Sequence, residues 1–149
     1  MKPLVILCLF FSTCVFAQTI DYNTKKGFAA NGYDVVAYFN NTAQEGSKQF
    51  TATFDGVAYK FTSKTNLNLF KKNPERYAPQ YGGYCAYAVA LKSDKVKINP
   101  KSFLVKNDKL YLFYDAWGTN TLELWQEKNQ NELIKKGDNN WNTIKLKNK

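Results

Sequence analysis

The stretch Asn73–Ala90, NPERYAPQYGGYCAYAVA, constrains the fold of this chain more than any other. Asn73 is a good helix cap, because its side chain accepts from free backbone N–H groups. Pro74 then fits the first helical position, where no backbone hydrogen bond is lost. Pro79 ends the helix, because the residue before a proline is displaced from helical geometry. These residues therefore predict a short helix that starts at Pro74 and stops before Pro79.

The second half of this stretch predicts a tight turn followed by another helix. Gly82 and Gly83 allow a close backbone approach that a side chain would prevent. After them, Tyr84–Ala90 alternates bulky residues with alanine and has good helix propensity. We expect a buried or half-buried helix with Cys85 in its first turn.

The N-terminus has the pattern of a secretory signal peptide. Lys2 supplies a positive charge, residues 4–16 are apolar, and Ala17 ends a plausible cleavage site. The apolar run is short for a bilayer span. The sequence thus predicts a signal peptide at residues 1–17 and one domain at residues 18–149. That domain is expected to be exported, periplasmic or secreted, and to lack a transmembrane segment after cleavage.

Charge argues against a nucleic-acid partner. The chain has 21 lysine and arginine residues against 12 acids, a formal net charge of +9. Arg76 is the only arginine, whereas nucleic-acid recognition usually recruits arginine for bidentate contacts. Lysines spread along the whole chain are typical of a solvated surface.

Two hairpins and several short helices predict an α+β fold. Phe50–Phe54 and Val57–Phe61 flank Asp-Gly, and Ser102–Lys106 and Lys109–Tyr114 flank Asn-Asp. Helices are expected at residues 35–39, capped by Asp34, at 64–72, capped by Ser63, and in the tail around Trp125 and Trp141. We find no internal repeat, and expect a small single domain with two β-hairpins packed against several short helices.

The chain has no histidine, and Cys85 is the only cysteine outside the predicted signal peptide. Ser-His-Asp and Cys-His catalysis and imidazole-based zinc sites are therefore excluded. Helix-terminal N–H groups stabilise a thiolate, so Cys85 is a candidate reactive or metal-ligating thiol. The alternative is that a small cysteine among alanines packs in the core.

Four more residues are candidates for a ligand site. Tyr84 and Tyr87 offer flat apolar faces with polar hydroxyl tips, and Tyr33 and Asp34 form a turn that could face them. The alternative roles are core packing for the tyrosines and helix capping for Asp34. Gly82 and Gly83 could also bind an anion through free N–H groups, although a glycine pair alone is a weak signal.

Several blocks resemble the exported bacterial YHS-domain proteins. They are Gly32–Phe39, the Tyr-x-Phe-x-Ser block at Tyr59–Ser63, the Asn-Pro-Glu-x-Tyr block at Asn73–Tyr77, and Tyr81–Tyr87 with its Gly-Gly-Tyr-Cys core. The resemblance extends over most of the chain after the signal peptide. It implies a small module related to metal-binding domains found beside heavy-metal transporters and in some oxygenases.

This chain departs from the metal-binding members of that family. There, a cysteine follows the Tyr-x-Phe pair and another stands four residues later, whereas this chain has Thr62 and Asn66 at those positions. A hydroxyl and an amide are poor ligands for a soft metal, so only Cys85 remains as a soft ligand.

Three hypotheses follow from the sequence. The first is an exported, non-enzymatic binding module that holds a metal ion or small ligand near Cys85, Tyr84, Tyr87, Tyr33 and Asp34. The second is a thiol-dependent enzyme or redox protein using Cys85. The third is an envelope protein-interaction module without a small ligand, in which the block around Cys85 only packs.

Overall fold

The structure is a computed structural model that describes residues 19–147, and the predicted signal peptide lies outside them. The described elements confirm the predicted α+β class. The strands are β1 (Thr24–Lys25), β2 (Phe28–Ala29), β3 (Ser47–Phe54), β4 (Val57–Phe61), β5 (Asn99–Lys106), β6 (Lys109–Phe113), β7 (Asp115–Ala116) and β8 (Thr119–Asn120). The α-helices are α1 (Lys64–Lys72), α2 (Pro74–Tyr77), α3 (Ala86–Lys92), α4 (Thr121–Gln126) and α5 (Gln130–Ile144), and the short 3-10 turns are η1 (Ala30–Gly32), η2 (Ala37–Asn40) and η3 (Gln80–Gly83).

Helices α1 and α2 begin at the residues that the sequence predicts, whereas the helix expected at residues 35–39 is the 3-10 turn η2, Ala37–Asn40. The Ser63 side chain accepts a hydrogen bond from Asn66 N at the start of α1, and the Asn73 side chain accepts one from Arg76 N at the start of α2. Helix α2 ends at Tyr77, two residues before Pro79. Each cap satisfies an N–H group that has no partner within its own helix, which fixes where the helix starts.

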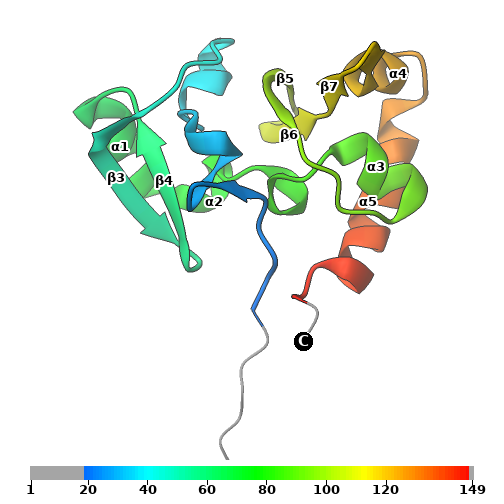
Figure 1. Cartoon of the computed structure of the whole chain (residues 1–149), viewed down its shortest axis with the longest axis horizontal. Coiled ribbons are helices and arrows are strands. Elements are labelled where there is room, and N and C mark those ends of the chain that lie inside the picture. Colours follow the sequence, from blue (N-terminus) through cyan, green and yellow to red (C-terminus); the bar gives the residue numbers. More distant parts are fainter. Residues whose placement is uncertain (1–18, 148–149) are drawn as a thin grey trace, which may run out of the picture.

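The strands form one mixed sheet and two separate hairpins. The sheet has the order β1-β2-β4-β3, with β2 parallel to β4 and the other pairs antiparallel. The pairs β5–β6 and β7–β8 are two-stranded. Hairpin β3–β4 with α1 lies at one end of the long axis, and α3, α4 and α5 lie at the other (Figure 1).

The two large hairpins repeat the same backbone pattern. Strands β3 and β5 have 8 residues each, and β4 and β6 have 5 each. The register shifts at equivalent places, between Ser47 and Thr51 in β3 and between Asn99 and Phe103 in β5. Both connecting turns place two successive residues at positive φ. An irregularity that occurs at the same place in both hairpins indicates a duplicated unit.

The segments before the hairpins repeat as well. Three successive residues have positive φ in each turn, Ala30–Gly32 and Tyr81–Gly83, and a tyrosine follows each. Asp34 N donates to Gln44 O at 2.9 Å, and Cys85 N donates to Val96 O at the same distance. We call turn, short helix, hairpin and helix, from η1 to α1, the first copy, and the matching elements from η3 to α4 the second copy.

The prediction that the chain contains no repeat is therefore wrong. The copies keep backbone conformation and pairing register while most of their side chains differ, for example Asp34 against Cys85, so the sequence shows little self-similarity. The second copy also carries an insertion, hairpin β7–β8 with the 96 % exposed Trp117 at its turn.

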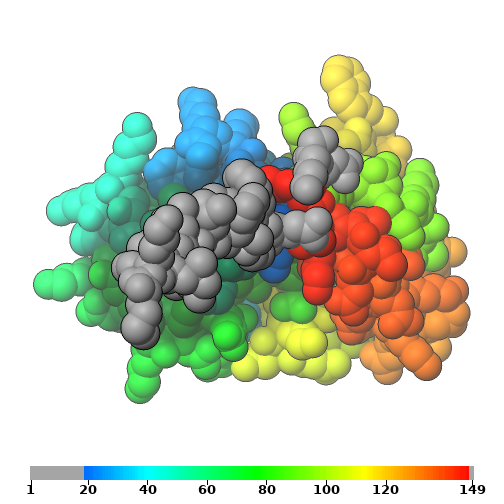
Figure 2. Space-filling model, turned by 90° about the horizontal axis from the view of Figure 1, so that it is seen from below, coloured from blue at the N-terminus to red at the C-terminus, as the bar shows by residue number. Residues whose placement is uncertain are grey.

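The core consists of two clusters of buried residues, and the first of them joins both copies, because it also contains Cys85 and Leu112. One cluster of buried residues includes Val35, Tyr59 and Phe61, and a second includes Tyr111 and Trp125. Helix α5 packs against α3 and completes the second cluster with Leu133. In Figure 2 the cyan-to-green residues of the first copy occupy one side, and the orange and red residues of α5 occupy the other.

We predict that Tyr59→Phe raises the stability of the protein. The Tyr59 side chain is fully buried, and its hydroxyl has no hydrogen-bond partner among the described residues. Removing an unsatisfied buried hydroxyl should raise the free energy of unfolding by about 1 kcal/mol. Urea unfolding followed by circular dichroism measures the change. The matched control is Tyr38→Phe, which loses a 2.6 Å hydrogen bond to Pro100 O and should lower stability. An equal effect of both variants would contradict the prediction.

Candidate functional site

Cys85 lies in the core and caps α3 instead of lying in its first turn. Its exposed fraction is 0 %, and its Sγ lies 3.3 Å from Thr121 Oγ1. None of the described residues form a group of three or more histidine, cysteine, aspartate or glutamate side chains that could hold a metal ion. A thiol in this position has no path to a substrate and no fellow ligands, so its surroundings are those of a packed core residue.

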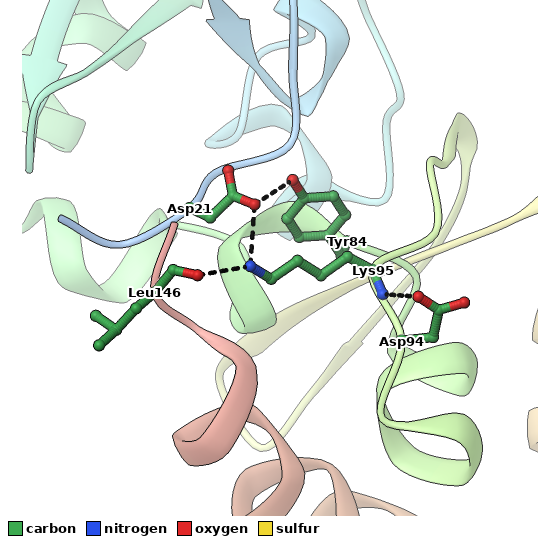
Figure 3. Close-up of polar contacts among 5 residues, drawn as sticks. All are labelled: Asp21, Tyr84, Asp94, Lys95 and Leu146. Atoms are coloured by element: carbon green, nitrogen blue, oxygen red, sulfur yellow. Dashed lines mark hydrogen bonds and ion pairs between the residues drawn. The ribbon is translucent and has the colours of Figure 1, made fainter. Parts of the chain in front are cut away.

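Tyr84 and Lys95 both contact Asp21 near the N-terminal end of the described chain, and Lys95 also reaches its C-terminal end (Figure 3). The Tyr84 hydroxyl donates to Asp21 Oδ2 at 3.1 Å, and Lys95 Nζ contacts the same carboxylate oxygen at 3.0 Å. Lys95 Nζ also donates to Leu146 O at 3.0 Å. Partial burial, followed by the neighbouring Asp21 charge, raises the pKa of Tyr84 to about 12. Lys95 thus holds the N-terminal segment beside the C-terminal one, and Tyr84 binds the Asp21 carboxylate that Lys95 contacts.

Asp34 is a buried hydrogen-bond acceptor. Its exposed fraction is 0 %. Oδ1 accepts from Val36 N at 2.9 Å and from Ala37 N at 3.3 Å. Oδ2 accepts from Thr62 N at 2.8 Å, Thr62 Oγ1 at 2.7 Å and Asn66 Nδ2 at 2.7 Å. Thr62 and Asn66 therefore bind this carboxylate.

Tyr33 is the only one of the five predicted site residues that lines a hollow described here. The hollow has a volume of about 380 Å³ and lies beside the first turn. We call it the Tyr33 hollow. It is lined by Lys25, Lys26, Phe28, Asn31, Tyr33, Glu45, Lys48, Lys60 and Pro100. Tyr87 instead is half-buried and packs against both core clusters.

Lys60 is the least exposed charged residue of this hollow. Its exposed fraction is 9 %, and its Nζ lies 3.3 Å from Glu45 Oε1 and 5.0 Å from the centre of the Phe28 ring. The sequence alternation suggests that Lys60 faces solvent, because Tyr59 and Phe61 face the core. Strand β4 is a central strand, however, and the Phe28 ring and the turn at Gly32 lie against the Lys60 side chain. The parallel pairing of β2 with β4 has no local sequence signal, so sequence reasoning missed Lys60.

A second hollow of about 430 Å³ lies beside the second turn. Tyr22 donates to Asp55 Oδ2 at 2.5 Å on one wall, and Tyr81 lies 3.1 Å from Asp138 Oδ1 on the other. Burial and the adjacent carboxylates raise the pKa of both phenols. Trp141 also lines this hollow. Because both tyrosine hydroxyls already bind protein carboxylates, this second hollow is less suited to a ligand than the Tyr33 hollow.

The structure thus separates the predicted site residues into different roles. Cys85 and Asp34 are fully buried, Tyr84 binds Asp21, Tyr87 packs between the two core clusters, and Tyr33 lines a hollow. The sequence missed Lys60, Asn31 and Glu45, which join Tyr33 at that hollow.

Within residues 19–147, no helix combines the length and apolar character needed to cross a bilayer. Comparison with protein-family models, curated proteins and solved structures gave no match.

Cys85 should react with a thiol reagent only when the protein unfolds. We expect no maleimide labelling of the native chain, in a form with Cys8 and Cys14 replaced by serine, and full labelling in denaturant. The reason is the complete burial of the thiol. Mass spectrometry counts the labels. Adding Thr53→Cys on the exposed part of β3 supplies a matched control that should take one label in the native state. Labelling of Cys85 in the native state would contradict this prediction and support the hypothesis of a thiol-dependent enzyme.

Proposed function

We propose that this protein is an exported, non-catalytic binding module of YHS type that holds a small ligand in the Tyr33 hollow. The observation that carries the proposal is the hollow itself, which gathers an aromatic ring, an amide and charged side chains from separate segments. Ligand sites commonly combine concave shape, aromatic walls and a few polar groups. Export and the YHS relationship rest on the sequence patterns alone.

This proposal moves the ligand away from Cys85. The sequence hypothesis placed the ligand among Cys85, Tyr84, Tyr87, Tyr33 and Asp34, but three of those side chains already have partners. Cys85 contacts Thr121, Tyr84 contacts Asp21, and both Asp34 oxygens accept several hydrogen bonds. Tyr33 keeps its role in the proposal, while Asp34 supports the turn from inside.

The other two hypotheses receive less support from these contacts. A thiol enzyme needs an accessible nucleophile, and Cys85 has an exposed fraction of 0 %. A protein-interaction module without a small ligand would give the Tyr33 hollow no binding role. The two alternatives remain as outcomes of the experiments on Cys85 and on the hollow.

The test is to map ligand contacts on ¹⁵N-labelled protein by NMR. Native mass spectrometry of protein from its own source first asks which small molecule copurifies. A set of small solutes of positive, negative and zero charge is then titrated. We expect shifts at Asn31, Tyr33 and Lys60, lost in Tyr33→Ala and kept in Cys85→Ala. Shifts that centre on Cys85, or no bound solute at all, would contradict the proposal.

A further inference from the structure

We infer that the Tyr33 hollow binds a small oxyanion, a phosphate or carboxylate group, and that Lys60 is its inner anchor. The inference rests on the proposed function, because it names the chemical class of ligand for the same hollow. The charge of the lining is its first support. The lining contains one carboxylate, that of Glu45, and four lysines: Lys25, Lys26, Lys48 and Lys60. A concave surface with such an excess of positive charge attracts anions.

The ammonium group of Lys60 has unused hydrogen-bonding capacity. It carries three donors, and among the described residues its one acceptor is Glu45 Oε1 at 3.3 Å. This distance is long for a contact between opposite charges, which usually measures about 2.7–2.9 Å. The Glu45 side chain is 66 % exposed, so it can turn into solvent at small cost. An oxyanion in the hollow could then accept from Lys60 directly.

The second copy shows what the fold alone requires at this position. In β6, Leu112 pairs with Phe103, as Lys60 pairs with Thr51 in β4. Leu112 has an exposed fraction of 0 %. The fold therefore accepts an apolar residue here, whereas a nearly buried ammonium costs desolvation energy. A costly charge that packing does not need, placed at the wall of a hollow, indicates a role in binding.

The shape of the backbone keeps room for this lysine. A Cβ atom at Gly32 would lie 2.6 Å from Lys60 Cε and 3.0 Å from Nζ. The glycine thus lets the lysine stem run past the turn and bring its ammonium to the hollow. Asn31 is the other polar side chain of the turn, and its Nδ2 lies 3.3 Å from Ile98 O. The amide group has a second N–H that is free to donate to an anion.

The experiment is an NMR titration of the full chain with inorganic phosphate and, separately, with succinate at constant ionic strength. Three variants are compared with the unaltered chain. Lys60→Met removes the proposed anchor, and Glu45→Gln removes the competing carboxylate. Lys109→Met, at the exposed first residue of β6 and away from the hollow, is the matched control for loss of one charge. Glucose serves as the neutral solute.

We expect one or both oxyanions to shift the resonances of Asn31 and Tyr33. Lys60→Met should weaken that binding about tenfold or more, because a charge-assisted hydrogen bond is lost. Glu45→Gln should strengthen it, and Lys109→Met should leave it within about twofold of the unaltered chain, because screening weakens distant exposed charges. Binding of phosphate without succinate, or the reverse, identifies which oxyanion the hollow accepts.

Several results would overturn the inference. Equal weakening by Lys60→Met and Lys109→Met would show a general attraction to lysines. Should Lys60→Met fail to fold, an unchanged affinity in Glu45→Gln would overturn it. If glucose shifts the resonances of Asn31 and Tyr33 and the anions do not, the oxyanion inference is wrong while the proposed function stands. If no solute shifts these resonances, the inference falls, and it falls together with the proposed function when the wider solute set also fails.

Discussion

Asp34→Ala should lower the free energy of unfolding by about 4 kcal/mol, the largest effect expected of any single substitution considered for this chain. The carboxylate accepts from three backbone N–H groups and two side chains, all of them close to its buried oxygens. Alanine would leave these donors unsatisfied, at about 1–3 kcal/mol for each one that water cannot reach. It would also detach α1, through Thr62 and Asn66, from the first turn. Chemical denaturation followed by circular dichroism measures the loss.

The control for this prediction is Thr62→Val, which keeps the shape and removes one hydroxyl donor to Asp34. It leaves Thr62 N and Asn66 Nδ2 bound to the carboxylate, so its effect should be about 1 kcal/mol. If Asp34→Ala cost no more than Thr62→Val, the carboxylate would not be the centre of this network. Asp34 would then act as an ordinary cap of the following turn.

Local sequence signals predicted the elements of the fold well. Ser63 and Asn73 cap helices because a short polar side chain there satisfies free N–H groups, and that requirement is local. Asp55-Gly56 and Asn107-Asp108 form the hairpin turns because both residues of each pair adopt positive φ. Such signals depend only on residues a few positions apart, so they can be recognised in the sequence without knowledge of the tertiary structure.

Pairings between distant segments could not be predicted in this way. Strand β2 has two residues and joins β4 by a single parallel pairing. A strand this short has no hydrophobic periodicity from which the pairing could be predicted. The duplication is hidden for a related reason. The two copies share backbone conformation, whereas Asp34 in one copy corresponds to Cys85 in the other and Lys60 corresponds to Leu112.

For the candidate site, too, local properties could be predicted from the sequence and tertiary properties could not. Sequence chemistry singled out Cys85 because a lone thiol at a helix start is reactive when exposed, and exposure is a tertiary property. It chose Tyr33 for its place in the turn, and this residue does line a hollow. Lys60 stands between the core residues Tyr59 and Phe61, and the period of a strand favours a solvent-facing side chain at such a position. Lys60 becomes a wall of the hollow because the turn at Gly32 and the Phe28 ring lie against its side chain, and these are tertiary contacts.

The protein should lose stability steeply above pH 10. Tyr38, Tyr59 and Tyr81 are buried, and desolvation is the main reason that the pKa of each lies well above the ordinary value. Below pH 10 these phenols are protonated in both states, so they give stability no dependence on pH. Above it, the unfolded state releases protons that the folded state keeps. The free energy of unfolding should then fall by about 1.4 kcal/mol per pH unit for each tyrosine, about 4 kcal/mol for the three.

The decisive comparison is between the unaltered chain and Tyr59→Phe, because these two proteins differ in one phenol alone. Urea unfolding at several pH values between about 9 and 11 gives the slope for each. Every contribution that the two proteins share cancels in the difference. Because the variant lacks one buried phenol, its slope above pH 10 should be shallower by about 1.4 kcal/mol per pH unit. Parallel slopes would mean that Tyr59 releases its proton as readily in the folded state as in the unfolded one, and that the interior around it admits water. The burial of Tyr59 argues for the shallower slope, because a phenolate there would have neither solvent nor a hydrogen-bond donor among the described residues to stabilise its charge.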